Sequence, residues 1–170
     1  MQEYGGEAIV LRREAQSEAD SRVSLFFKRF GRLTAKAKSA RKITSKLSAH
    51  LEPGNITEVR LVEKNDILLV DAMKKSRVEI SPSNLYLLDR VLGEGDPDPA
   101  LWHAVRDGQF SWEHALALLG WDPREASCGT CGAFPDNFHV ARHDFFCMSC
   151  VAKVSARELR ELIAINNVTQ

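Results

Sequence analysis

The stretch that decides the fold of this chain is "SRVSLFFKRFGRLTAKAK", residues 21–38. A run of apolar and β-branched residues leads to Gly31, and small or apolar residues then occupy every second position. Leu33, Ala35 and Ala37 would lie on one face of an extended strand, with the intervening polar residues on the other face. The pattern predicts a β-hairpin with a tight bend at Gly31.

Three further runs have the composition of strands, and they lie at residues 5–14, 55–63 and 67–80. Together with the hairpin they make five strands, and the connection over residues 40–54 is irregular. Such a set suits a small closed barrel of the OB type, because closure removes the exposed sheet edges. We therefore expect an α+β fold in which residues 1–80 form a five-stranded, OB-like nucleic-acid-binding domain.

The two adjacent phenylalanines of the hairpin are expected to lie on different faces of the sheet. Phe26 and Phe27 would point to opposite faces of a regular strand. One of them can enter the barrel, and the other then needs a helix or a base to cover it.

The second part of the chain has helical patterns with clear start signals. Ser81, Asp98 and Ser111 are each suited to cap a helix, and the first two are followed by proline. Leucines at helical spacing follow each cap. A last helix is predicted from Ser155, because "SARE" fits a capping box. We expect residues 81–170 to form a small helical domain.

The strongest motif of the sequence is a pair of C-x2-C segments separated by fifteen residues, formed by Cys128, Cys131, Cys147 and Cys150. This spacing matches a zinc site, because two such loops can direct four thiolates to one point. We predict one structural zinc ion in a ribbon at about residues 125–152. A redox pair or unliganded thiols are the alternative, which the regular spacing disfavours.

Two histidines between the cysteine pairs, His139 and His143, could each replace one cysteine as a ligand, but four cysteines already complete the shell. A four-cysteine shell keeps no open position for water, so the metal would hold the ribbon folded. The sequence contains no phosphate-binding glycine loop, nucleophile motif or zinc-protease helix. We therefore expect a protein that is not an enzyme.

The charge distribution is uneven, although the chain is formally neutral. Residues 1–51 carry eleven basic and five acidic side chains, and residues 52–126 carry eight basic and fourteen acidic ones. Residues 28–46 contain eight basic residues and no acidic one. This segment is either a solvated face without a partner or a stripe that follows a phosphate backbone. The candidate nucleic-acid-binding residues are Arg32, Lys36, Lys38, Arg41, Lys42 and Lys46.

The chain resembles the RecO family of bacterial recombination mediators. The resemblance is carried by "EAIVLRRE", "SEADSRVSLFFKRFGRLTAKAKSARKITSKL" and "LEPG", and by "LLGWDP" leading into "CGTCG" and "CMSC". It implies an N-terminal OB-fold followed by a helical domain with an inserted zinc ribbon. The six basic residues match the family's basic motif, and the four cysteines match its zinc ligands. Ser39 stands where family members commonly have glycine.

The resemblance also implies a function. RecO-like proteins bind single- and double-stranded DNA, anneal complementary strands, act with RecR and the single-strand-binding protein, and help to load RecA. They usually continue after the ribbon through helices that form part of the docking surface for the single-strand-binding protein. We expect a cytoplasmic, nucleoid-associated bacterial protein of the RecF-type repair pathway, with no membrane partner.

Two other functions remain open. The chain could be a zinc-stabilised adaptor that binds proteins through its acidic middle and its ribbon. It could also bind RNA, because OB barrels accept either nucleic acid. No apolar run is long enough to span a bilayer, and the N-terminus lacks the apolar stretch of a secretory signal.

Overall fold

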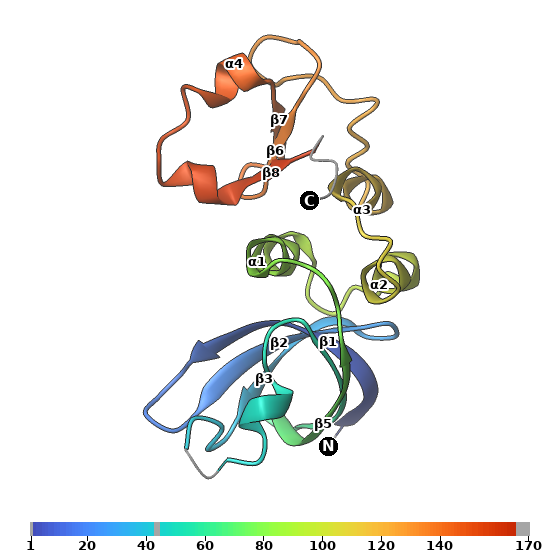
Figure 1. Ribbon diagram of the computed structural model, residues 1–170, viewed down its shortest axis with the longest axis vertical. Coiled ribbons are helices and arrows are strands. Elements are labelled where there is room, and N and C mark those ends of the chain that lie inside the picture. The colour runs from blue at the N-terminus through green and yellow to red at the C-terminus, as the bar shows by residue number, and fades with distance from the viewer. Residues whose placement is uncertain (1, 43–44, 166–170) are drawn as a thin grey trace. The chain divides into compact units, whose positions relative to one another are not determined.

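The computed structural model describes residues 2–42 and 45–165. The chain divides into two compact units, Met1–Gly108 and Gln109–Gln170. The division lies later than the boundary that the sequence predicted between residues 80 and 81. The difference arises because the first two helices belong to the same unit as the barrel (Figure 1).

The first unit contains a closed five-stranded barrel, as the sequence predicted (Figure 1). Its strands are β1 (Gln2–Ala15), β2 (Ser21–Phe27), β3 (Gly31–Ala37), β4 (Asn55–Glu63) and β5 (Ile67–Arg77). Their order around the barrel is β1-β2-β3-β5-β4, and β1 also pairs with β4 to close it. Only β3 and β5 run parallel among these pairs, and the other neighbours are antiparallel.

The predicted alternation along β3 is confirmed. Leu33, Ala35 and Ala37 are buried in the barrel core, whereas the residues between them are only half-buried. Gly31 has φ of 67°, and a Cβ at this position would collide with the backbone of Asp96. The bend therefore needs glycine both for its left-handed backbone and for the close approach of the chain after the first helix.

The two phenylalanines separate as expected. Phe27 belongs to the barrel core, whereas Phe26 does not, although it is fully buried. Phe26 lies opposite Ile9 on the outer face of β1 and β2. The indole N–H of Trp102, in the second helix, donates to the Phe26 carbonyl at 3.1 Å. A helix, not a ligand, thus covers this face.

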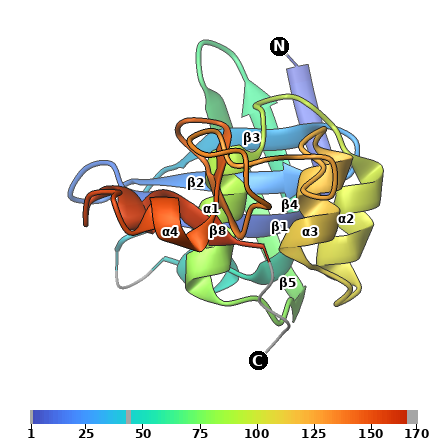
Figure 2. The same ribbon diagram turned by 90° about the horizontal axis from the view of Figure 1, so that it is seen from above.

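Two helices complete the first unit, α1 (Pro82–Val91) and α2 (Pro99–Arg106). Their predicted caps are confirmed, because Ser81 accepts from the N–H of Asn84 and Asp98 accepts from that of Leu101. Both views place α1 across β1 and β2 (Figures 1 and 2).

A buried carboxylate joins α1 to three strands. The side chain of Asp89 is 1 % exposed, and its Oδ2 lies 2.8 Å from Nε of Arg12 on β1. Its Oδ1 accepts from the hydroxyl of Ser24 on β2 and lies 3.7 Å from Nη1 of Arg32 on β3. A carboxylate this deep needs such partners, because an unpaired buried charge is strongly unfavourable.

A second arginine organises the irregular connection between β3 and β4. The Arg13 guanidinium donates to the carbonyls of Ala40 and Ser48 at 2.9 and 3.1 Å, and to the carboxylate of Glu52 at 3.0 Å. This connection includes the short 3₁₀ helix η1 (Ser48–His50). One side chain on β1 therefore satisfies backbone groups that the sheet leaves unpaired.

The described part of the second unit combines two α-helices and a 3₁₀ helix with a small three-stranded sheet. Its elements are α3 (Trp112–Leu118), β6 (Asn137–His139), β7 (Asp144–Phe146), α4 (Met148–Val151), the 3₁₀ helix η2 (Glu158–Glu161) and β8 (Leu162–Ala164). The sheet order is β7-β6-β8, with antiparallel neighbours. The predicted cap of α3 is confirmed, because Ser111 accepts from the N–H of His114.

The prediction of a last α-helix from Ser155 is wrong. Glu158 does accept from the backbone N–H and hydroxyl of Ser155, as in a capping box. The chain nevertheless forms only η2 and then β8, where Ile163 is buried opposite Phe138. Pairing with β6 buries Ile163 and satisfies the backbone of residues 162–164 in a sheet, whereas Leu159 lies in η2 and is 49 % exposed.

No helix among residues 2–42 and 45–165 has the length and apolar character needed to cross a bilayer.

Replacing the buried carboxylate should weaken the attachment of α1. In Asp89→Asn two arginines lose their counter-charge, so the free energy of unfolding should fall by about 3 kcal/mol. Glu94→Gln is the matched control, because Glu94 is exposed and lies 3.7 Å from the same Arg32. Its effect should stay below about 1 kcal/mol. Urea unfolding of both variants measures the difference, and equal effects would contradict the structural role of Asp89.

Candidate metal centre and nucleic-acid interface

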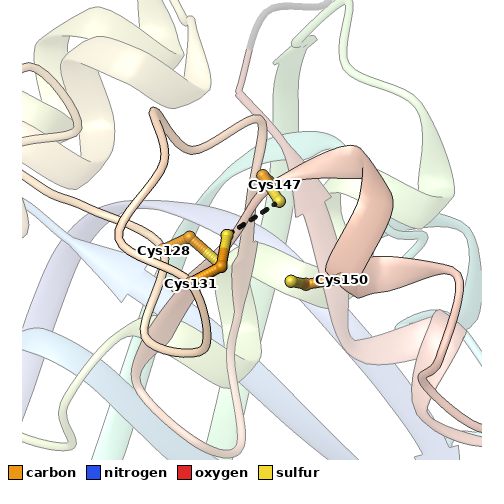
Figure 3. Close-up of side chains that lie close together, drawn as sticks. All are labelled: Cys128, Cys131, Cys147 and Cys150. Atoms are coloured by element: carbon orange, nitrogen blue, oxygen red, sulfur yellow. Dashed lines mark hydrogen bonds between the residues drawn. The ribbon is translucent and has the colours of Figure 1, made fainter.

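The four predicted cysteines come together in the second unit (Figure 3). Their Sγ atoms all lie within 4.8 Å of one another, and the Sγ atoms of Cys131 and Cys147 are 3.6 Å apart. Thiolates bound tetrahedrally at about 2.3 Å from an ion would be separated by about 3.8 Å. The arrangement therefore has the dimensions of a four-cysteine metal centre.

Two local turns bring each cysteine pair to this point. After the first pair, the N–H of Gly132 donates to the Cys128 carbonyl at 2.8 Å, with Gly132 at φ of 75°. This left-handed position explains the glycine that follows the second cysteine. In the second pair, Cys147 precedes α4 and the N–H of Cys150 donates to the Cys147 carbonyl at 3.1 Å. Both pairs thus use short-range backbone hydrogen bonds to direct their thiols.

The electrostatics of the four thiols call for a cation. Backbone N–H donation, from Cys147 first, lowers the pKa of Cys128 to about 6. Hydrogen bonding with the thiol of Cys131 is the main cause that raises the pKa of Cys150 to about 12. Hydrogen bonding therefore favours ionisation of one sulfur and disfavours it at its neighbour, and the negative charge of Cys128 is the smallest of the causes that raise the pKa of Cys150. A bound divalent cation would remove this obstacle and allow all four sulfurs to act as thiolates.

The two histidines do not join this cluster in the described part of the chain. His139 is buried, and its Nδ1 accepts from the N–H of Arg142 at 3.3 Å. The ring of His143 stacks on Trp121 with ring centroids 5.1 Å apart. Both histidines thus contact residues of the second unit other than the four cysteines.

In the first unit, the segments before β2 and after β3 lie side by side. The N–H of Arg41 donates to the Ala19 carbonyl at 3.0 Å, and its guanidinium donates to the Ser17 carbonyl. The N–H of Ser39 donates to Oδ1 of Asp20 at 2.9 Å. These contacts bring the predicted residues Lys36, Lys38, Arg41 and Lys42 to one end of the β2–β3 pair.

Sequence reasoning missed one cation of this group. Arg22 is exposed and lies directly opposite Lys36 in the antiparallel register of β2 and β3. The sequence could have predicted this position from the bend at Gly31. If Phe27 pairs with Gly31, the antiparallel register places Arg22 opposite Lys36. We define the basic surface as Arg22, Lys36, Lys38, Arg41 and Lys42.

Arg32 was predicted as a DNA-facing residue, but the structure places it differently. Its side chain is 18 % exposed and its Nε donates to the Leu92 carbonyl at 3.0 Å. It also faces the carboxylates of Asp89 and Glu94, each at 3.7 Å. The helical segment therefore neutralises this cation, and its guanidinium is already engaged.

Lys46 is exposed, but no contact between described residues joins it to the basic surface. Residues 43–44, which separate it from Lys42, lie outside the described residues.

The charge of the basic surface is only partly balanced. Nζ of Lys36 lies 3.3 Å from Oδ2 of Asp20. Hydrogen-bond donation by the Ser39 N–H is the main cause that lowers the pKa of Asp20. Burial opposes this effect, and the nearby Lys36 and Lys38 lower the pKa further. Among the described residues, Arg22, Lys38 and Lys42 form no salt bridge. The surface therefore retains uncompensated positive charge.

The comparison with known families concerns the barrel. Residues 1–75 match the family described as "Recombination protein O N terminal". The match covers β1 to β4 and most of β5, and it includes every residue of the basic surface.

Ser39, which the resemblance places at a common glycine position, has φ of 56°. A left-handed conformation strains an L-residue, so Ser39→Gly should raise the free energy of unfolding by about 0.5–1 kcal/mol after the added chain entropy of glycine is subtracted. Ser39→Ala is the control that keeps the strain and should give no such gain. Thermal and urea unfolding measure both variants, and a gain with alanine would show that strain is not the cause.

Proposed function

We propose that this chain, whose residues 1–75 match the N-terminal family of recombination protein O (RecO), is a RecO-like protein that binds DNA and anneals complementary strands without being an enzyme. The family match indicates a role in DNA recombination and repair. In the proposal, the protein acts as a mediator in the RecF-type pathway, binds single- and double-stranded DNA, and helps RecA to load.

The observation that carries this proposal is the basic surface. Five cations come from two adjoining segments of the barrel, and Arg22 and Lys36 lie directly opposite each other on neighbouring strands. Like charges in this arrangement oppose folding. A polyanion bound across them would neutralise the repulsion and release counterions. OB barrels commonly bind single strands with such charged grooves.

We assign the four-cysteine cluster to one structural zinc ion. Four thiolates favour zinc over hard cations, and the tetrahedral dimensions of the cluster support this choice. Cys128, Cys131, Cys147 and Cys150 would hold the ion and leave no position for a reacting water. The ion would keep the short strands and turns of the ribbon folded.

The proposed partners beyond DNA are a RecR-like protein and a single-strand-binding protein, both of them implied by the family. A cytoplasmic, nucleoid-associated location in a bacterium would follow from this role.

An adaptor function is the second candidate, and exposed apolar side chains in the second unit favour it. Phe134 is 63 % exposed and Met148 is 67 % exposed. In an adaptor these side chains would form part of the protein-binding surface. A pull-down with and without nuclease separates the two functions, because an adaptor keeps its partners after the nucleic acid is removed.

Reversing two free cations should weaken binding to single strands. Lys38→Glu with Lys42→Glu removes about two phosphate contacts, so the slope of log K against log[salt] should become shallower by about 1.4. Fluorescence anisotropy of a labelled oligonucleotide across a salt titration measures this. RNA of equal length, added as a competitor, tests the preference for DNA.

The matched control is Lys74→Glu with Lys75→Glu, which changes the net charge equally. Both lysines are exposed on β5, which pairs with β3 only at Leu68, and Lys74 lies opposite Thr57 on β4. Equal losses in the two double variants would indicate a response to net charge alone and would refute a localised interface.

Purified protein should contain one zinc ion per chain by elemental analysis. Removal by a chelator should unfold the ribbon, since its metal-binding energy is also its folding energy. Hydrogen exchange should then rise across residues 128–150 and remain low in the barrel strands. Cys131→Ser, at the exposed ligand, should release zinc faster than wild type. Protein that is fully folded without stoichiometric metal would exclude this assignment.

A further inference from the structure

A small pocket opens in the first unit at the hairpin between β2 and β3. It has a volume of about 190 Å³ and is lined by Gly5, Gly6, Glu7, Phe27, Lys28, Arg29, Phe30 and Trp102. This volume is below the roughly 300 Å³ at which pockets for complete small molecules begin. The pocket therefore suits a single ring or side chain. None of its lining residues belongs to the basic surface.

One wall of the pocket is an uncovered length of strand. The pairing of β1 with β2 ends at Ala8 and Phe27, whereas the pairing of β1 with β4 continues to Gln2. Residues 2–7 of β1 thus extend past the end of the β2 ladder. Their backbone can offer hydrogen-bonding groups on the side that β2 does not cover.

Two glycines lie in this strand, and Gly6 has φ of 134°. Gly5 and Gly6 pair in regular register with Arg60 and Val59, so they do not mark a bulge between β1 and β4. A Cβ added to Gly6 would meet no atom within 4 Å and would project into open space. The φ of 134° accounts for glycine at position 6, and the absence of a side chain there leaves room for a ligand to approach this strand.

Two phenylalanine rings also line the pocket. Phe27 and Phe30 contact each other edge to face with centroids 5.6 Å apart. The Arg29 guanidinium lies over the Phe30 ring, 5.8 Å from its centroid. The planar guanidinium of Arg29 therefore already lies over one face of the Phe30 ring. Another planar group could take that position and leave Arg29 free to contact an anion.

The mouth of the pocket is basic. Lys28 and Arg29 are both exposed, and neither forms a salt bridge with another described residue. The one carboxylate in the lining, Glu7, is bound to Arg106 at 2.7 Å. A ligand that combines a planar aromatic ring with negative charge matches these features, and a nucleotide within a single strand has both.

We propose that this pocket takes one unpaired nucleobase of a bound single strand, with Lys28 and Arg29 on the flanking phosphates. The inference rests on the proposed DNA binding and adds a second contact region to it. The basic surface supplies charge alone, whereas the pocket requires a base. The strand would then be held at two places on the barrel unit.

The test compares an oligothymidylate with an abasic oligonucleotide of the same length and charge. Wild type should bind the oligothymidylate about tenfold more tightly, the value expected for one stacked base. Phe30→Leu keeps the apolar bulk but removes the ring, so it should abolish this preference. Lys38→Glu with Lys42→Glu should weaken binding to both ligands and leave their ratio unchanged.

A second measurement does not depend on the folding of Phe30→Leu. Wild type is irradiated with an oligonucleotide that carries one 5-iodouracil, and the crosslinked peptide is identified by mass spectrometry. Crosslinks to the hairpin residues 28–30 or to Trp102 support the pocket. Crosslinks confined to other segments overturn it.

The outcomes separate the two proposals. Equal binding of both oligonucleotides, with a steep salt dependence, would refute the base pocket and leave the basic surface intact. Absence of binding to either would refute the proposed function and this inference together. If Lys28 and Arg29 bound an extended acidic peptide but not oligothymidylate, the pocket would be a protein-docking site. That result would overturn the assignment to a base.

Discussion

The ion pair between Asp89 and Arg12 is the constraint on which the barrel unit depends. It brings a carboxylate with 1 % exposure from α1 onto the outer face of the strands, where Ser24 and Arg32 also contact it. Because the carboxylate is buried, it can be accommodated only with its partners in place. The contact therefore determines where α1 lies, and it does so through residues of three different strands.

The position of α1 divides the outer face of β1, β2 and β3 into two regions. Towards the hairpin, the face is covered: Phe26 is fully buried, and Arg32 is turned towards Asp89 and the Leu92 carbonyl. Towards the other end, Arg22 and Lys38 remain exposed. The same helix thus removes one cation from the predicted stripe and leaves the others for a partner. The proposed interface is consequently shorter than the sequence suggests and is centred on the ends of two strands.

The second unit depends on a constraint of another kind. Its sheet has three strands of three residues each, so its regular structure is short. Buried rings such as Phe138 and Phe145 contribute a small core, and the four-cysteine cluster gathers two distant turns. A metal ion in this cluster would stabilise a segment that buries little apolar surface on its own. Its contribution would be structural, whereas in the proposed function the barrel supplies the charge for binding DNA.

Local patterns in the sequence were sufficient for the hairpin, the strands, the three capped helices and the cysteine cluster. Each of these features depends on residues that are close in the chain or on a spacing that one turn can satisfy. The orientation of Arg32 depends on its ion pair with Asp89. Residues 162–164 form a strand because they pair with β6. The compact unit that contains the barrel extends past residue 80, because it also includes α1 and α2. These outcomes needed the tertiary structure, because they arise from contacts between segments that are far apart in the chain, such as Ser24 and Asp89, which local periodicity does not encode.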